Sequence, residues 1–116
     1  MVMPREIVED VSNVLRSAAC GKGNRQPGFL SAIQILERLP TALKARLIEE
    51  HGPPGRESGS HSTATHVVEK SLRMLVNAGQ AHKEGMDSRG LQFQIDGEWV
   101  EPGYGLCALY QWIGER

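Results

Sequence analysis

The stretch STATHVVEKSLRMLVNAG, from Ser62 to Gly79, decides how this chain folds. Its apolar residues Val68, Leu72 and Leu75 recur at helical spacing, so one side of a helix over 62–78 must be buried. Val67, Met74 and Ala78 are expected to widen this apolar stripe. A hydroxyl at the start of the stretch can cap the first free amides, and Gly79 can take the left-handed conformation that ends a helix. The opposite side of the predicted helix is polar and consists of His66, Glu69, Lys70, Arg73 and Asn77.

Three more helices are predicted upstream of this stretch, over 4–19, 29–39 and 41–52, because each segment repeats its apolar residues at helical spacing. Pro40 separates the second helix from the third, since proline disfavours helical geometry in the residue before it. The glycine-rich and proline-rich segment GPPGRESGSH, residues 52–61, has too few apolar groups to pack and is predicted to be a flexible, exposed loop.

After Gly79 the apolar period changes from helical to alternating. This change predicts short strands in QAHKEG and LQFQI, joined through MDSRG. The segment FQIDGEWV carries the Asp-Gly signature of a two-residue hairpin turn, and LCALYQWI is typical of a final apolar strand that closes the sheet. The predicted fold is therefore α+β, a three- to four-helix bundle followed by a small antiparallel β-sheet.

Composition limits the number of domains and the classes of function. The 116 residues are 40% hydrophobic, which suits one compact domain over 1–116, with 1–27 as an N-terminal helix plus linker. The formal net charge is −1, so nucleic-acid binding would need a local basic patch. No apolar run approaches a membrane span, and MVMPREIVEDVSNVL lacks the pattern of a secretion signal. We expect a cytoplasmic protein without membrane association, in which Cys20 and Cys107 are reduced.

The segment THVVEKSLRMLVNAGQAHKEG resembles the recognition helix and wing of winged helix-turn-helix DNA-binding proteins. The likeness lies in a pair of apolar residues, then Leu72 and Leu75, then Ala78-Gly79 turning into a strand, and it covers Phe29 to about Ile95. The link over 52–61 is longer than the usual turn of roughly three to four residues. The resemblance implies a winged-helix fold, similar to small regulatory proteins of phages and mobile elements, and a role as a transcriptional regulator that binds double-stranded DNA.

If the helix over 62–78 enters the major groove, an arginine can donate two hydrogen bonds to a guanine, and a lysine can contact a phosphate. Since one short helix buries little surface, we expect a homodimer. Basic residues outside this helix could add contacts to the DNA backbone, and they are Lys22, Arg25, Lys44 and Arg46. The candidate DNA-binding residues are His61, Thr63, Thr65, His66, Lys70, Arg73 and, at the predicted wing tip, Arg89. The same charges could instead be only a solvated helix face.

A second hypothesis places the working surface on the predicted sheet. Acidic and aromatic residues gather in the last third of the chain, where they could form core or a surface for a protein partner. The chain would then be a non-enzymatic adaptor or inhibitor of phage type. The candidate partner residues are Asp96, Glu98, Trp99, Glu101 and Tyr104.

No enzyme, cofactor or metal is predicted. The histidines and cysteines lack the spacing of a zinc site, because His61 and His66 are five residues apart and do not stack on one helical face. The glycine-rich loop lacks the Gly-Lys-Ser/Thr ending of a nucleotide-binding loop. Serines near His61 have no nucleophile-elbow context, and Glu49 and Glu50 are adjacent and point apart on a helix.

Overall fold

The structure is a computed structural model, and it describes residues 2–18, 28–52, 63–87, 92–100 and 106–114. The described residues contain a 3-10 turn, η1 (Pro4–Ile7), and the helices α1 (Val8–Ser17), α2 (Ala32–Arg38), α3 (Thr41–His51) and α4 (Ala64–Asn77). They also contain the strands β1 (Leu30–Ser31), β2 (Ala81–Asp87), β3 (Phe93–Ile95), β4 (Glu98–Val100) and β5 (Leu106–Trp112). The predicted α+β fold class is confirmed.

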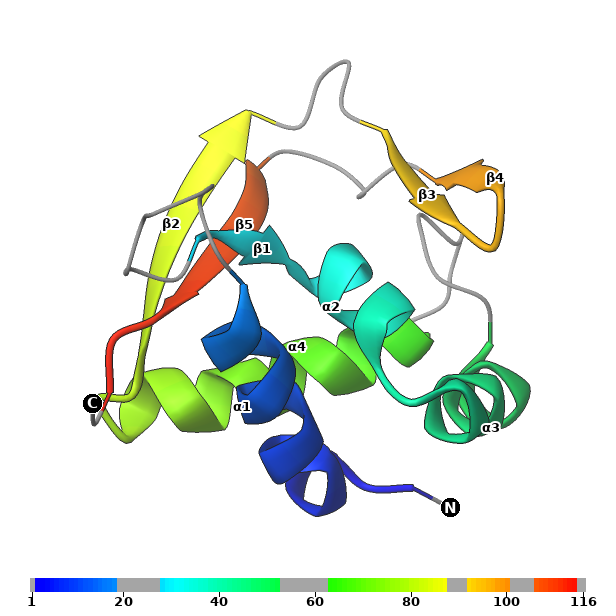
Figure 1. Cartoon of the computed structure of the whole chain (residues 1–116), viewed down its shortest axis with the longest axis horizontal. Helices are drawn as coiled ribbons and strands as arrows, with labels where there is room; N and C mark the ends of the chain where they lie inside the picture. Colours follow the sequence, from blue (N-terminus) through cyan, green and yellow to red (C-terminus); the bar gives the residue numbers. More distant parts are fainter. Residues whose placement is uncertain (1, 19–27, 53–62, 88–91, 101–105, 115–116) are drawn as a thin grey trace.

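The central strand of the main sheet is β5, which pairs antiparallel with β1 on one side and β2 on the other (Figure 1). The pairing with β2 runs its whole length, from Ala81 opposite Trp112 to Asp87 opposite Leu106. Within β2, Ala81 is buried and the residues from His82 to Asp87 are exposed. Exposure includes Lys83, although alternation along the strand puts it on the same face as Ala81.

The other two strands, β3 and β4, form a separate hairpin that packs on α2 (Figure 1). Its turn is the predicted Asp-Gly turn, since Asp96 and Gly97 have φ of 52° and 85°. The single sheet expected from the sequence is therefore wrong. The long strands β2 and β5 match each other in register, and the three-residue strands β3 and β4 pair only with one another.

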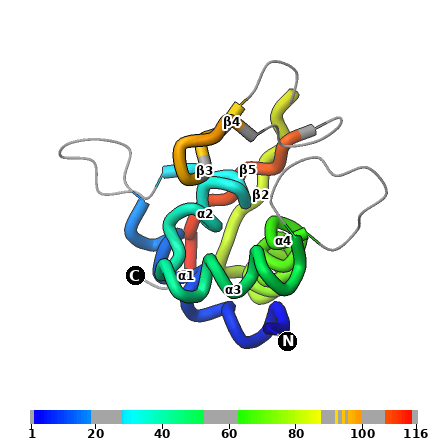
Figure 2. The backbone as a smooth tube through the Cα atoms, turned by 90° about the vertical axis from the view of Figure 1, so that its right-hand side faces the viewer, coloured from blue at the N-terminus to red at the C-terminus, as the bar shows by residue number. Residues whose placement is uncertain are grey.

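Helix α4 packs against five other elements, η1, α1, α2, α3 and β2. Figure 2 shows it almost end-on, with α1 and α2 on its inner side. Val68, Leu72 and Leu75 are buried, which confirms the centre of the predicted apolar stripe. Val67 is buried as well, but the prediction that Met74 and Ala78 widen the stripe is wrong, because both are exposed. The helix begins where the Thr63 hydroxyl accepts a hydrogen bond from the His66 N–H (3.2 Å), and it is followed by a glycine with φ of 77°.

The second predicted helix, 29–39, is shorter in the structure. Leu30 and Ser31 pair with β5, and α2 starts at Ala32. A capping box sets this start, because the Ser31 hydroxyl accepts from the Gln34 N–H (3.2 Å) and the Gln34 side chain accepts from the Ser31 N–H (2.9 Å). The helix ends before Pro40, as predicted, and the described part of the N-terminal helix ends at Ser17.

The ends of α3 and α4 meet although ten residues that are not described, 53–62, connect them. The Ala64 N–H donates to the Gly52 carbonyl oxygen at 3.1 Å. Gly52 has φ of 101°, a conformation that glycine adopts without strain. The C-terminal end of α3 and the N-terminal end of α4 are therefore as close together as if a short turn connected them.

Candidate nucleic-acid interface

One row of polar side chains runs along the outer side of α4. His66, Lys70, Arg73 and Asn77 occupy positions i, i+4, i+7 and i+11, which a helix of 3.6 residues per turn places in line. Lys70, Arg73 and Asn77 are exposed, and 38% of the His66 side chain is exposed. We call these four residues the outer row.

The acidic residue of α4 lies beside the outer row. Glu69 approaches His66, with 3.7 Å between its Oε1 and the imidazole Nδ1. It also lies near β5, where burial, followed by the charge of the Glu69 carboxylate, raises the pKa of Tyr110 to about 12. Burial, followed by the same carboxylate, also raises the pKa of the Cys107 thiol. The single acid of α4 thus borders the row on the side of β5.

Lys83, which is not among the predicted DNA-binding residues, extends the outer row. Together with Lys70 and Arg73 it forms what we call the positive surface. Lys83 is exposed on β2 and stands opposite Tyr110 in the sheet register. Arg73 also acts on Tyr110, because its charge lowers the pKa of that phenol against the effect of burial. Arg73 and Lys83 are therefore both neighbours of one tyrosine. No local pattern of residues indicates this proximity, since it depends on the register between β2 and β5.

Two of the predicted DNA-binding residues do not reach outward. Thr63 is 7% exposed and uses its hydroxyl as the helix cap. Thr65 is 9% exposed and lines a cavity of about 30 Å³ beside Cys107 and Ala108. Its Oγ1 has no hydrogen-bond partner among the described residues. The buried side of α4 is wide enough to include both threonines. The remaining predictions, His61 and Arg89, lie outside the described residues.

Fewer basic residues than predicted are available to contact the DNA backbone. Lys44 is only 11% exposed and binds Glu37 and Asp96 at 3.2 and 2.8 Å, so it is wrong as a phosphate contact. The hydrogen bond that Lys44 donates to the Asp96 carboxylate is the main cause that raises the pKa of Lys44, against the effect of burial. Arg46 is 58% exposed and binds Glu50 at 3.1 Å. Lys22 and Arg25 lie outside the described residues.

The candidate partner surface does not form one sheet face. Asp96, Glu98 and Trp99 lie on the β3–β4 hairpin, not on the three-stranded sheet. Asp96 is engaged by Lys44, whereas the exposed Trp99 borders a cleft beside α2. Glu101 and Tyr104 lie outside the described residues. In β5, Tyr110 is part of the core and Trp112 packs against it.

Among the described residues, no three His, Cys, Asp or Glu side chains are grouped so that they could hold a metal ion. Within the same ranges, no helix has the length and apolarity needed to cross a membrane. No protein-family model matches the sequence, no curated protein is detectably similar to it, and no solved structure matches the fold.

Proposed function

We propose that the protein is a small transcriptional regulator of winged-helix type that binds double-stranded DNA through α4. The observation that carries this proposal is the outer row, four aligned polar residues of which two are permanent cations. A helix presents such a row to the major groove when its other side is packed on a supporting domain. The acid of α4 stands at the edge of the row, so it does not separate these cations.

The topology supports the proposal. A helix, a short strand and further helices precede two long strands, and the sheet order is β1-β5-β2. The C-terminal end of α4 leads through Gly79 directly into β2, so the sheet supports the helix from one end. At its other end, the Ala64 to Gly52 hydrogen bond holds α3 and α4 together in the manner of a helix-turn-helix pair.

The side chains supply the contacts that such a complex needs. Arg73 can offer two parallel donors to guanine, and Asn77 can pair with adenine through its amide. Lys70 and Lys83 are placed to contact phosphates on either side of these readers. Because a single row of four residues buries little surface, we propose that two copies act together on adjacent half-sites.

The test is binding of the purified protein to duplex DNA across a salt series, with Arg73→Glu beside the wild type. We expect affinity to fall linearly in the logarithm of the salt concentration, and the variant to lose binding. Arg5→Glu is the matched control, because it makes the same change of charge at an exposed position on η1, outside α4. Sedimentation with and without DNA measures the number of copies. Equal loss in both variants, or no binding by the wild type at low salt, contradicts the proposal.

A second function, a protein-binding adaptor or inhibitor, is supported by one observation. Trp99 is 64% exposed on the hairpin, and large exposed aromatic residues are enriched in protein interfaces. This alternative predicts that Trp99→Ala abolishes capture of a partner and that the charge of Arg73 is irrelevant.

A further inference from the structure

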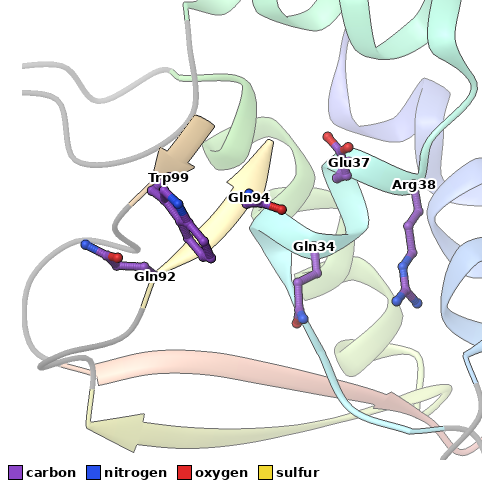
Figure 3. Close-up of a pocket in the computed structure, with 6 residues that line it drawn as sticks. All are labelled: Gln34, Glu37, Arg38, Gln92, Gln94 and Trp99. Atoms are coloured by element: carbon purple, nitrogen blue, oxygen red, sulfur yellow. The ribbon is translucent and has the colours of Figure 1, made fainter. Parts of the chain in front are cut away.

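A cleft of about 330 Å³ lies between side chains of α2 and side chains of the β3–β4 hairpin, which packs on this helix (Figure 3). One wall is α2 and the other is the hairpin together with the residue before it. The lining residues are Gln34, Glu37, Arg38, Gln92, Gln94 and Trp99. A volume of this size is at the lower end of the range for small-molecule sites, roughly 300 to 1,000 Å³, and suits a single base with its sugar.

The two walls of the cleft are fixed to one another. Lys44 of α3 binds Glu37 of α2 at 3.2 Å and Asp96 of the hairpin turn at 2.8 Å. The ammonium group therefore joins both walls, and it also offsets the charge of the carboxylate that lines the cleft. Glu98 adds a negative charge on β4, but alternation along the strand places it on the opposite face from Trp99.

The polar groups of the cleft have hydrogen-bonding capacity to spare. The Oε1 of Gln34 accepts from the Ser31 N–H, which leaves its amide donors for other partners. Among the described residues, the side chains of Gln94 and Arg38 form no hydrogen bond or ion pair. The cleft therefore combines an exposed indole, amides that can donate and accept, and one unpaired guanidinium.

We propose that this cleft binds an adenine nucleotide, with the base stacked on Trp99, its edge paired with the glutamine amides and its phosphate on Arg38. An exposed indole is a stacking surface for a base. A glutamine amide matches the adjacent acceptor and donor of adenine, and a guanidinium matches a phosphate. The source is either a free mononucleotide or an unpaired adenine within a single strand. The inference does not depend on DNA binding by α4, since the two sites share no residue.

The test uses Trp99 as its own reporter. The chain has two tryptophans, and Trp112→Phe removes the other one while leaving a ring for Arg16 to contact, as its guanidinium does now at 5.4 Å. In this background, AMP is expected to quench the indole emission saturably, with a dissociation constant below about 1 mM. A single-stranded oligo(dA) is titrated in parallel. Saturation by AMP identifies the free nucleotide, and saturation by oligo(dA) alone identifies the single strand.

Two variants make the assignment specific. Arg38→Ala is expected to weaken AMP roughly tenfold while leaving adenosine unchanged, because only the nucleotide carries phosphate. Trp99→Ala, measured by calorimetry, is expected to abolish binding, and Trp99→Phe is expected to keep part of it, which separates lost stacking from lost folding. Arg73→Glu is expected to bind AMP normally. The inference is overturned if neither probe saturates at millimolar concentration, or if Trp99→Ala binds AMP as tightly as the wild type.

Discussion

Lys44 of α3 and Asp96 of the β3–β4 turn are joined by a 2.8 Å contact between Nζ and Oδ1, although they are 52 positions apart in the sequence. The same ammonium group also binds Glu37 of α2. One nearly buried lysine thus connects two helices to the hairpin. This connection joins the two walls of the candidate nucleotide cleft.

Replacing this lysine is expected to loosen the hairpin. Lys44→Met keeps most of the aliphatic stem but leaves both carboxylates without their cation, so we expect the free energy of unfolding to fall by about 1 kcal/mol. Urea denaturation measures the change, and in the Trp112→Phe background the emission of Trp99 reports the hairpin. Arg46→Met is the control, because its partner is one turn away on the same helix and its side chain is 58% exposed. An equal effect of the two substitutions would show that Lys44 does not hold the hairpin.

Ser71 presents the opposite case, a polar group without a partner. Its side chain is fully buried in α4, and within the part of the chain that the structure describes its Oγ has no hydrogen bond. Ser71→Ala removes this group and favours the helix, so we expect the free energy of unfolding to rise by about 1 kcal/mol. Ser12→Ala is the comparison, because that hydroxyl donates to the Glu9 carbonyl at 2.9 Å and should not gain stability when removed. Destabilisation by Ser71→Ala would mean that the hydroxyl has a partner.

The N-terminal segment is attached to α3 by a contact that weakens when the pH becomes acidic. The Val2 N–H donates to the Glu50 carboxylate at 2.6 Å, and this bond is the main cause that lowers the pKa of Glu50 below 4.5. A lowered pKa means that the carboxylate contributes stability above about pH 4.5, and that this contribution is lost as the pH falls through the folded value. Thermal melts from pH 6 downward should therefore show a smaller acid-induced decrease for Glu50→Gln than for the wild type. Identical pH profiles would contradict this account.

At alkaline pH the relevant group is Tyr110. Burial raises its pKa to about 12, so the folded state keeps the phenol proton more tightly than the unfolded state does. Its contribution is complete below about pH 10 and is lost as the pH rises toward 12, at up to about 1.4 kcal/mol per pH unit. The difference in unfolding free energy between the wild type and Tyr110→Phe should change over this interval. A difference that is constant between pH 9 and 12 would show that Tyr110 titrates normally.

Local signals in the sequence predicted the elements that depend on neighbouring residues. The apolar stripe and caps of α4 act within a few residues, and the Asp96-Gly97 turn needs only its own backbone conformation. The outer-row residues Lys70 and Arg73 were predicted for the same reason, because helical spacing places them opposite the buried stripe.

Features that depend on distant contacts were not predictable. The short strand at Leu30 exists because Tyr110 pairs with it, and the division into a sheet and a hairpin follows from the register of β5 with β2. Lys83 joins the positive surface through that same register. Thr65, which is predicted to face outward, is buried because several elements pack around α4 and cover this position, which lies outside the apolar stripe.

The most direct test of the proposed function is the amide NMR spectrum of the labelled protein during titration with duplex DNA at low salt. The account predicts that the largest shifts occur at Lys70, Arg73 and Asn77, that Lys83 follows them, and that the Trp99 indole signal is unchanged. Absence of shifts in the outer row, or shifts confined to Trp99 and the hairpin, would contradict DNA binding by α4.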